Sequence, residues 1–259
     1  MTYCVAMHLA EGLVFVSDSR TNAGIDHIAT FRKLFTFGTP GERLLVVQTA
    51  GNLATSQSVI NLLQQRIRRD GASLLSVPSV YDATALVAET AREVMKRDGG
   101  NLAGNTDLSC SFLVGGQIAG EPPALYSIYP QGNFIQATPD TPFLQLGESK
   151  YGKPILDRNL TFNTPPEQAL RCALVSFDST IRSNLSVGMP LDLLVYHRDN
   201  PAGGLPGHRG RRLFQRHPPA VGRRPARLAG TPAVAAPGVQ HLTTLQPAAP
   251  ALRPAMWRR

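Results

Sequence analysis

The sequence predicts an α+β fold in which pairs of helices pack outside two stacked antiparallel sheets. Strand and helix signals occur in separate runs, in the order strands, two helices, strands, two helices, strand. The strand segments are short and apolar, whereas the helical segments repeat apolar residues at helical spacing. Because segregated runs of this kind favour antiparallel sheets, a four-layer arrangement with helices over two stacked sheets accommodates the whole order.

The first strands are predicted to form two hairpins. Residues 2–9 alternate loosely between apolar and polar side chains, and residues 13–16 form an apolar run rich in valine, so a turn is expected between them. A second pair of strands is expected at residues 33–37 and 43–48, around a turn that contains Gly38 and Gly41.

Two helices and four strands are expected next. Apolar positions recur at helical spacing over residues 52–69 and again over residues 82–96. Strand signals then resume in four segments, at residues 109–114, 124–128, 133–137 and 143–146. The glycine pairs at 99–100 and 115–116 are interpreted as turns, because neither has the strand and helix flanks of a nucleotide-binding loop.

Two further helices and one strand complete the predicted order. Helical patterns cover residues 151–158 and 166–182, and the second of these helices has proline early in its first turn, where a missing N–H is tolerated. The last strand is expected at residues 191–196, after the Gly188-Met189-Pro190 turn.

The last 59 residues differ sharply in composition from the rest of the chain. Residues 201–259 contain ten arginines and ten prolines but no lysine, aspartate or glutamate. Without these ten positive charges the net charge of +8 becomes −2 for residues 1–200. Since the tail lacks the apolar periodicity of a packed element, we expect one folded domain over residues 1–200 and a disordered tail over residues 201–259.

Two explanations of the tail remain open. It could be a basic arm that binds nucleic acid or another polyanion. It could instead be the product of a shifted reading frame, since arginine, proline, alanine and glycine have GC-rich codons. A nucleic-acid arm usually mixes lysine with arginine and interleaves aromatic residues, whereas only Phe214 and Trp257 occur here. The composition favours the shifted frame, and nucleic acid is not an expected partner.

The bulk composition predicts a cytoplasmic protein without metal or cofactor. No segment resembles a signal peptide, and no apolar run approaches the ~20 residues that span a bilayer. Cys4, Cys110 and Cys172 are odd in number and widely spaced, which is typical of a reduced cytosol. The six histidines show no ligand spacing, so metal ligation is not expected.

Thr2 is the residue that points most directly to chemistry. Threonine is small enough for the initiator Met1 to be removed behind it, which would leave a threonine with a free α-amino group. The hydroxyl would be a nucleophile, and an α-amine of pKa ~7.7–8.0 could accept its proton near neutral pH. Many ordinary chains begin with Met-Thr, so the weight comes from Asp18, Lys33 and Gly51 further along.

This set resembles the pattern of the proteasome β-type, N-terminal-nucleophile peptidases. The bacterial proteasome-like family called Anbu is similar to this chain in four segments, which are residues 17–24, 30–33, 147–158 and 182–188. The similarity covers roughly residues 2–198. It implies the four-layer αββα sandwich of N-terminal-nucleophile hydrolases.

The resemblance implies a role for each of the four residues. Thr2 would attack the scissile carbonyl, with its α-amine as base. The ammonium of Lys33 would lower the proton affinity of the neighbouring amine and hydroxyl, and Asp18 would keep Lys33 charged and oriented. The backbone N–H of Gly51 would form the oxyanion hole.

The resemblance also implies how substrate binds. Thr21 and Asn22 resemble the loop that pairs with the substrate main chain as an added strand. By the same analogy Phe31, Thr49 and Leu53 would line the first specificity pocket, which suggests a modest preference for apolar side chains.

Two positions depart from the family pattern. Proteasome subunits have a serine after the glycine that is here Gly147, whereas this chain has Glu148 followed by Ser149. They also have an aspartate three residues before a serine; here Ser186 fits the serine, but Ser183 replaces the carboxylate. Glu148 is a candidate for restoring negative charge near Thr2, and these departures put catalytic strength in doubt.

The expected function is therefore hydrolysis of amide bonds through an acyl-enzyme on Thr2. The resemblance implies rings or spirals of identical subunits that admit unfolded proteins or short peptides. An ATP-driven unfoldase would be compatible with such rings, but no sequence feature identifies one. The alternatives are hydrolysis of a non-protein amide, a catalytically weak or inactive ring-forming scaffold, and polyanion binding through the tail.

Overall fold

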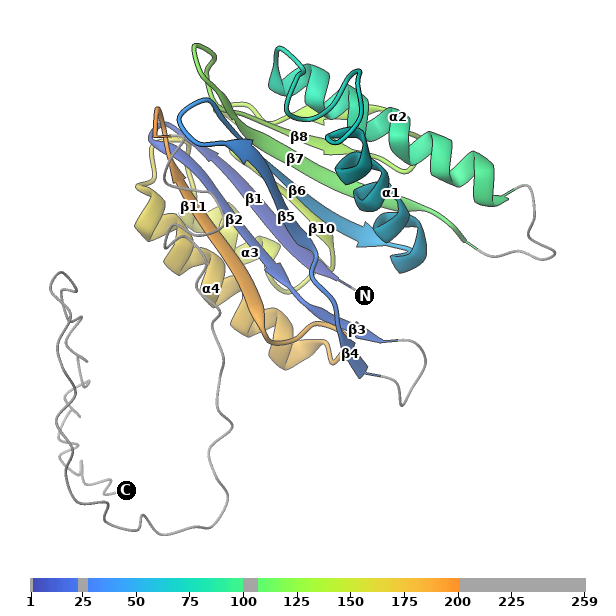
Figure 1. Ribbon diagram of the computed structural model, residues 1–259. Helices are drawn as coiled ribbons and strands as arrows, with labels where there is room; N and C mark the ends of the chain where they lie inside the picture. The colour runs from blue at the N-terminus through green and yellow to red at the C-terminus, as the bar shows by residue number, and fades with distance from the viewer. Residues whose placement is uncertain (1, 23–27, 100–106, 201–259) are drawn as a thin grey trace, which may run out of the picture. The chain divides into compact units, whose positions relative to one another are not determined.

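The computed structural model describes residues 2–22, 28–99 and 107–200, so the predicted tail lies outside the described residues (Figure 1). The strands are β1 (Tyr3–Leu9), β2 (Gly12–Asp18), β3 (Arg20–Asn22), β4 (Ile28–Thr30), β5 (Leu34–Thr39), β6 (Arg43–Gly51), β7 (Cys110–Ile118), β8 (Ala124–Ile128), β9 (Phe134–Gln136), β10 (Phe143–Gly147) and β11 (Leu191–His197). The helices are α1 (Leu53–Arg66), α2 (Val80–Gly99), α3 (Lys153–Asn159) and α4 (Pro166–Ser183).

Two antiparallel sheets form the centre of the domain. The first has the strand order β10-β1-β2-β11, and the second has the order β5-β6-β7-β8-β9. The neighbours of β1 come from opposite halves of the chain, because Cys4 pairs with Ser17 of β2 and with Leu146 of β10. This pairing brings residues near position 147 beside the N-terminus.

Side chains of β1 are buried on both faces of its sheet, which explains its loose alternation. Cys4 and Ala6 lie in the core between the two sheets, whereas Tyr3, Val5 and Met7 pack toward the helices. β6 divides its side chains between two cores in the same way. A strand buried on both faces needs apolar residues at nearly every position, so strict alternation is lost.

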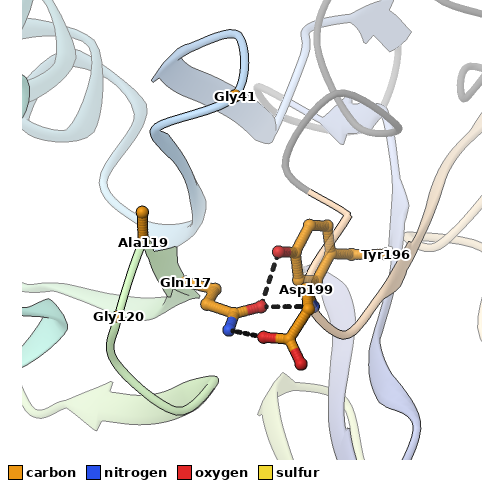
Figure 2. Close-up of a pocket in the computed structure, with 6 residues that line it drawn as sticks. All are labelled: Gly41, Gln117, Ala119, Gly120, Tyr196 and Asp199. Carbon is orange, nitrogen blue, oxygen red and sulfur yellow. Dashed lines mark hydrogen bonds between the residues drawn. The ribbon is translucent and has the colours of Figure 1, made fainter.

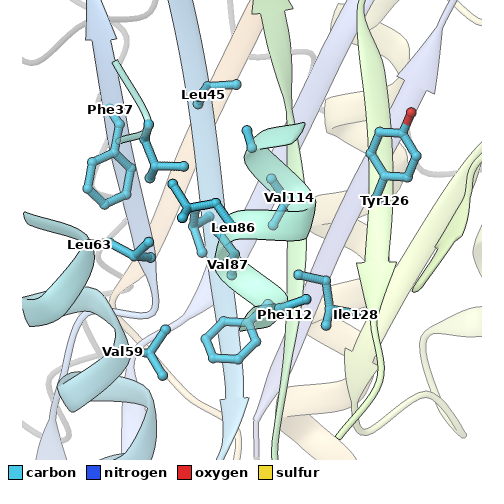
Figure 3. Close-up of a cluster of buried hydrophobic side chains, with 14 of the residues drawn as sticks. Phe37, Leu45, Val59, Leu63, Leu86, Val87, Phe112, Val114, Tyr126 and Ile128 are labelled. Atoms are coloured by element: carbon cyan, nitrogen blue, oxygen red, sulfur yellow. The ribbon is translucent and has the colours of Figure 1, made fainter. Parts of the chain in front are cut away.

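Each sheet carries a pair of helices on its outer face. Helices α1 and α2 cover the second sheet through the buried side chains shown in Figure 3, which include Val59, Leu63, Leu86, Val87 and Phe112. Helices α3 and α4 cover the first sheet through Leu156, Ala169, Ala173 and Phe177. The predicted four-layer αββα fold is therefore confirmed.

The interpretation of glycines 115 and 116 as a turn is wrong. Both residues lie inside β7, where they pair with Val46 and Leu45 of β6. A Cβ on Gly116 would lie 2.9 Å from the Cα of Leu45, and one on Gly115 would lie 3.0 Å from the ring of Phe15 across the sandwich. These glycines allow close approach within and between the sheets. At the other pair, Gly99 ends α2 and Gly100 lies outside the described residues.

A two-stranded ribbon was not predicted. Its strands β3 and β4 have three residues each, and Thr21 pairs with Ala29. Thr21 and Asn22 therefore lie on a strand rather than in a loop. So short a polar segment carries no readable alternation, which is why the sequence gives no strand signal there.

The end of the sandwich that lies away from Thr2 is closed by a polar network centred on an amide (Figure 2). The Gln117 carbonyl oxygen accepts from the Tyr196 hydroxyl at 2.6 Å and from the Asp199 N–H at 2.9 Å. The Gln117 amide donates to the Asp199 carboxylate at 2.6 Å. These residues border a hollow of about 240 Å³ and tie β7 to the end of β11.

No helix in the described ranges is both long and apolar enough to cross a membrane. Among the same residues, no three histidine, cysteine, aspartate or glutamate side chains gather where they could hold a metal ion.

Candidate active site

Thr2 lies at the start of β1, between the ends of β10 and β2. Its carbonyl accepts a hydrogen bond of 2.7 Å from the Glu148 N–H, and the residue is only 9% exposed. Gly147 has a φ of +79°, and a Cβ there would lie 2.6 Å from the carbonyl carbon of Thr2. Only glycine allows this close approach, so Gly147 fixes the backbone of Thr2 against β10.

A buried ion pair lies one residue away from Thr2. The Lys33 Nζ donates to Asp18 Oδ1 at 2.7 Å, and the lysine side chain is 5% exposed while the aspartate side chain is fully buried. The same carboxylate accepts from the Tyr3 N–H at 3.0 Å and from the Gly188 N–H at 3.3 Å. Lys33 also donates to the Arg20 carbonyl at 2.6 Å. Thr2 is therefore linked through its neighbour to the pair that the sequence predicted.

Burial and hydrogen bonding act in opposite directions on Asp18. Burial raises the pKa of the Asp18 carboxyl above its usual value, while the Lys33 ammonium and the N–H groups of Tyr3 and Gly188 favour the ionised form. Neither charge of the pair is exposed, so each depends on the other. Removing one partner would leave an uncompensated charge in the interior.

Gly51 reaches the same end of the sandwich as Thr2. The Cys4 thiol of β1 contacts the Thr49 carbonyl of β6 at 3.8 Å. Thr2 lies two residues before Cys4, and Gly51 lies two residues after Thr49, so both residues reach the same end of the sandwich (Figure 1). Gly51 has a φ of +104°, and a Cβ there would lie 2.8 Å from the Cα of Cys110. The backbone at Gly51 therefore requires glycine. The next residue, Asn52, caps α1.

Glu148 and Ser186 meet through a residue that the sequence did not single out. The Asn184 amide donates to Glu148 Oε2 at 2.8 Å, and the Ser186 N–H donates to Asn184 Oδ1 at 2.9 Å. Ser183 ends α4 with an exposed side chain. Asn184 directly follows the position where the family carboxylate is replaced, and that adjacency was a signal that could have drawn attention to it. Ser149 is half-buried, and its carbonyl accepts from the first N–H of α3.

The predicted substrate-binding residues lie around β3 and the start of α1. Thr21 Oγ1 is buried without a hydrogen-bond partner in the described part of the chain, and the backbone of Asn22 pairs with Ile28. Phe31 is 37% exposed and Thr49 is 5% exposed. Leu53 is half-buried as the first residue of α1.

A hollow of about 490 Å³ lies beside β10 and reaches Gly147 and Ser149, next to Thr2. Neither this hollow nor the one at Gln117 is lined by Phe31, Thr49 or Leu53. The first specificity pocket therefore stays a prediction.

The sequence profile of proteasome subunits matches residues 2–195. The chain belongs to the proteasome family, among its Anbu-type members. A search of curated proteins finds no match.

Several solved Anbu structures are similar to this proteasome-family chain. The helical assembly of the Anbu complex from Pseudomonas aeruginosa shares 94% identity with a TM-score of 0.75, covering 77% of this chain and 83% of that one. Anbu from Yersinia bercovieri shares 60% identity with a TM-score of 0.73, covering 76% and 82%. An Anbu mutant from Hyphomicrobium sp. strain MC1 shares 49% identity with a TM-score of 0.73, covering 78% and 84%.

Proposed function

We propose that the chain is a threonine-type peptidase or amidohydrolase that cleaves amide bonds through an acyl-enzyme on Thr2. The observation that carries this proposal is the buried Lys33–Asp18 pair. Its Asp18 carboxylate accepts a hydrogen bond from the N–H of Tyr3, the residue that follows Thr2. A buried charge pair is weak evidence for stability alone. Its place beside an N-terminal threonine gives it a catalytic use.

The proposed reaction begins after removal of Met1. The freed α-amine of Thr2 accepts the hydroxyl proton while the hydroxyl oxygen attacks the substrate carbonyl. The tetrahedral intermediate then collapses: the C–N bond breaks, the amine product leaves with that proton, and an ester on Thr2 remains. Water then attacks the ester and gives a proton to the α-amine; the bond between the acyl carbon and the Thr2 oxygen breaks, this oxygen takes the proton back, and the carboxylic acid product is released.

Lys33 and Gly51 supply the electrostatic support for these steps. The Lys33 ammonium, held charged by Asp18, favours the deprotonated form of the nearby hydroxyl. The Gly51 N–H, at the same end of the sandwich, would donate to the oxyanion. An extended peptide would add to the edge of β3 that lies opposite β4, with pairing at Thr21 and Asn22.

The assembly proposed for the chain is a homo-oligomeric spiral or ring. The Pseudomonas aeruginosa relative forms a helical assembly and shares 94% identity over the matched region. Such an enclosure would admit unfolded proteins or short peptides to Thr2. We place this hydrolase domain at residues 1–200, in the cytoplasm, with residues 201–259 as an appended tail.

The test is the intact mass of the purified protein after incubation with a threonine-directed epoxyketone. This reagent reacts with both the hydroxyl and the free α-amine, so an adduct requires Thr2 at the N-terminus. Thr2→Ala is the matched control, because alanine also permits removal of Met1. We expect loss of Met1 and one adduct in the unsubstituted protein only. Retained Met1 would rule out the mechanism, and trimmed but unlabelled protein would favour an inactive scaffold.

The tail has a separate test, in which residues 201–259 are deleted. If the tail is not part of the enzyme, the shortened chain labels at the same rate as the full chain. Nucleic-acid binding that depends on salt and disappears with the deletion would instead identify the tail as a polyanion-binding arm.

A further inference from the structure

The carboxylate of Glu148 is held from two sides. Its Oε2 accepts from the Asn184 amide at 2.8 Å, and its Oε1 accepts from the Lys150 N–H at 2.9 Å. Its own N–H donates to the Thr2 carbonyl at 2.7 Å. The position of the Glu148 side chain is therefore tied to the backbone of the proposed nucleophile.

The segment that follows Asn184 is tied to the other side of the site. The Gly188 N–H donates to Asp18 Oδ2 at 3.3 Å, and the Arg20 guanidinium donates to the Leu185 carbonyl at 2.9 Å. The segment 184–188 thus connects the Glu148 side of Thr2 with the Asp18–Lys33 side. Asn184 is the point at which the segment joins Glu148.

We propose that Asn184 is a positioning residue, which sets Thr2 relative to the Lys33–Asp18 pair through its hydrogen bond to Glu148. The inference rests on the proposed function at Thr2. Asn184 organises this side of the site, whereas Ser183, at the position where proteasome subunits have an aspartate, is exposed.

The hydrogen-bonding pattern explains why an amide is needed at position 184. Glu148 offers only acceptors, so its neighbour must donate. The Ser186 N–H offers only a donor, so the same neighbour must also accept. An amide does both with one side chain, whereas an ionised aspartate could serve Ser186 but would face the Glu148 carboxylate with a second negative charge.

Asn184→Asp should therefore break the hydrogen bond to Glu148 at neutral pH, and a lower pH should restore it. Two carboxylates about 2.8 Å apart cannot both ionise without strong repulsion, so the pair would hold one proton at a raised pKa. We expect labelling of Thr2 to fall ~10- to 100-fold at neutral pH, the range for loss of a hydrogen bond to a charged group. The deficit relative to the unsubstituted protein should shrink as the pH falls and the pair takes up the proton.

Glu148→Gln breaks the same connection without that pH dependence. If its carbonyl oxygen accepts from Asn184, its amide faces the Lys150 N–H; if it turns round, two amide groups face each other. In either orientation, two N–H donors face each other and one hydrogen bond is lost. We expect ~10-fold slower labelling at every pH.

The double variant Glu148→Gln/Asn184→Asp keeps acceptors for the Lys150 and Ser186 N–H groups and restores the hydrogen bond between positions 148 and 184 with its polarity reversed. The introduced glutamine accepts from the Lys150 N–H and donates to the introduced aspartate, which still accepts from the Ser186 N–H. The net charge is the same as in the unsubstituted protein. We expect the double variant to label within ~3-fold of the unsubstituted rate, although each single variant is slow.

The experiment measures the second-order rate of epoxyketone labelling at Thr2 against pH for the four proteins, together with their thermal unfolding. Asn159→Asp, an exposed asparagine at the end of α3, is the control for adding a carboxylate elsewhere. Three results together support the inference: slow labelling of both single variants, a smaller deficit for Asn184→Asp at low pH, and near-normal labelling of the double variant.

Four results would overturn it. Singles that label at the unsubstituted rate would show that Asn184 positions nothing. A double as slow as the product of the two singles would show no coupling between the residues. Asn184 would have a structural role alone if the unfolding temperature falls in the single variants and recovers in the double variant while all folded proteins label at the same rate. If the unsubstituted protein itself loses Met1 but does not label, the proposed function fails, and the inference fails with it.

Discussion

The two ends of the sandwich are closed by polar networks of opposite character. At the Thr2 end the network is charged and buried, with Lys33 and Asp18 at 2.7 Å. At the other end Gln117 joins Tyr196 and Asp199 through its amide, and the aspartate side chain is largely exposed. The first network links the end of β2 with the segment before β11, and the second links β7 with the end of β11, but only the first removes two charges from water. That cost is what distinguishes a site organised for chemistry from a structural closure.

Lys33→Ala should produce the largest effect at the Thr2 end. It removes the ammonium that the proposed mechanism places near Thr2, and it leaves the Asp18 carboxylate buried without its partner. We expect ~10²–10⁴-fold slower epoxyketone labelling and a loss of about 3–5 kcal/mol in the free energy of unfolding, measured by denaturant titration.

The double variant Asp18→Asn/Lys33→Met separates these two effects. It contains no buried charge, so most of the stability should return while labelling stays slow. A double variant that labels like the unsubstituted protein would contradict the catalytic role of the pair.

Gly51→Ala should give the next largest effect. The added Cβ would approach Cys110 while φ is +104°, which displaces the proposed oxyanion donor. We expect ~10²–10³-fold slower turnover of an amide substrate, the usual cost of one lost oxyanion donor. Gly41→Ala is the matched control at the other end of β6, because its φ is +80° but its surroundings are open. Equal losses in the two variants would argue against an oxyanion role for Gly51.

The sequence predicts features that depend on local patterns better than contacts between distant segments. The αββα layers follow from local apolar patterns, and Thr2, Asp18, Lys33 and Gly51 follow from a family pattern that spans these strands. Pairings between distant segments do not follow from local pattern.

The role of Asn184 depends on such distant pairing. It requires Gly147 of β10 to lie opposite Tyr3 of β1, a register that a hairpin turn does not set. The glycines inside β7 were misread for a related reason. Gly115 packs against Phe15 of the other sheet and Gly116 against Leu44 and Leu45 of β6, and neither contact can be seen in the neighbouring residues.

Gln117→Leu should weaken the fold without affecting the chemistry. It leaves the Tyr196 hydroxyl and the Asp199 N–H without their acceptor, and each unsatisfied group costs about 1–3 kcal/mol. We expect a lower denaturation midpoint and an unchanged labelling rate at Thr2 under folding conditions. A slowed labelling rate in fully folded protein would show that the two ends are coupled.

The smallest predicted effect is alkaline destabilisation at both ends. Burial raises the pKa of Tyr3 and of Tyr196 to about 12, from a usual value of 10.0. The folded state therefore keeps these protons longer than the unfolded state does. Their stability contribution is complete below pH ~10 and is lost as the pH rises from there toward 12.

Tyr3→Phe and Tyr196→Phe should each flatten the fall in unfolding free energy over this pH range. Denaturant titrations of the two variants and the unsubstituted protein at several pH values measure this. An unchanged slope in both variants would mean that neither tyrosine carries the effect.

The most direct test of the central claim is to trap the acyl-enzyme. The protein would be incubated with an activated peptide ester, quenched in acid, and mapped by mass spectrometry after digestion. The account predicts one acyl group on the peptide that begins at Thr2, greatly reduced in Lys33→Ala. An acyl group on another residue, or none on trimmed chains that begin at Thr2, would contradict it.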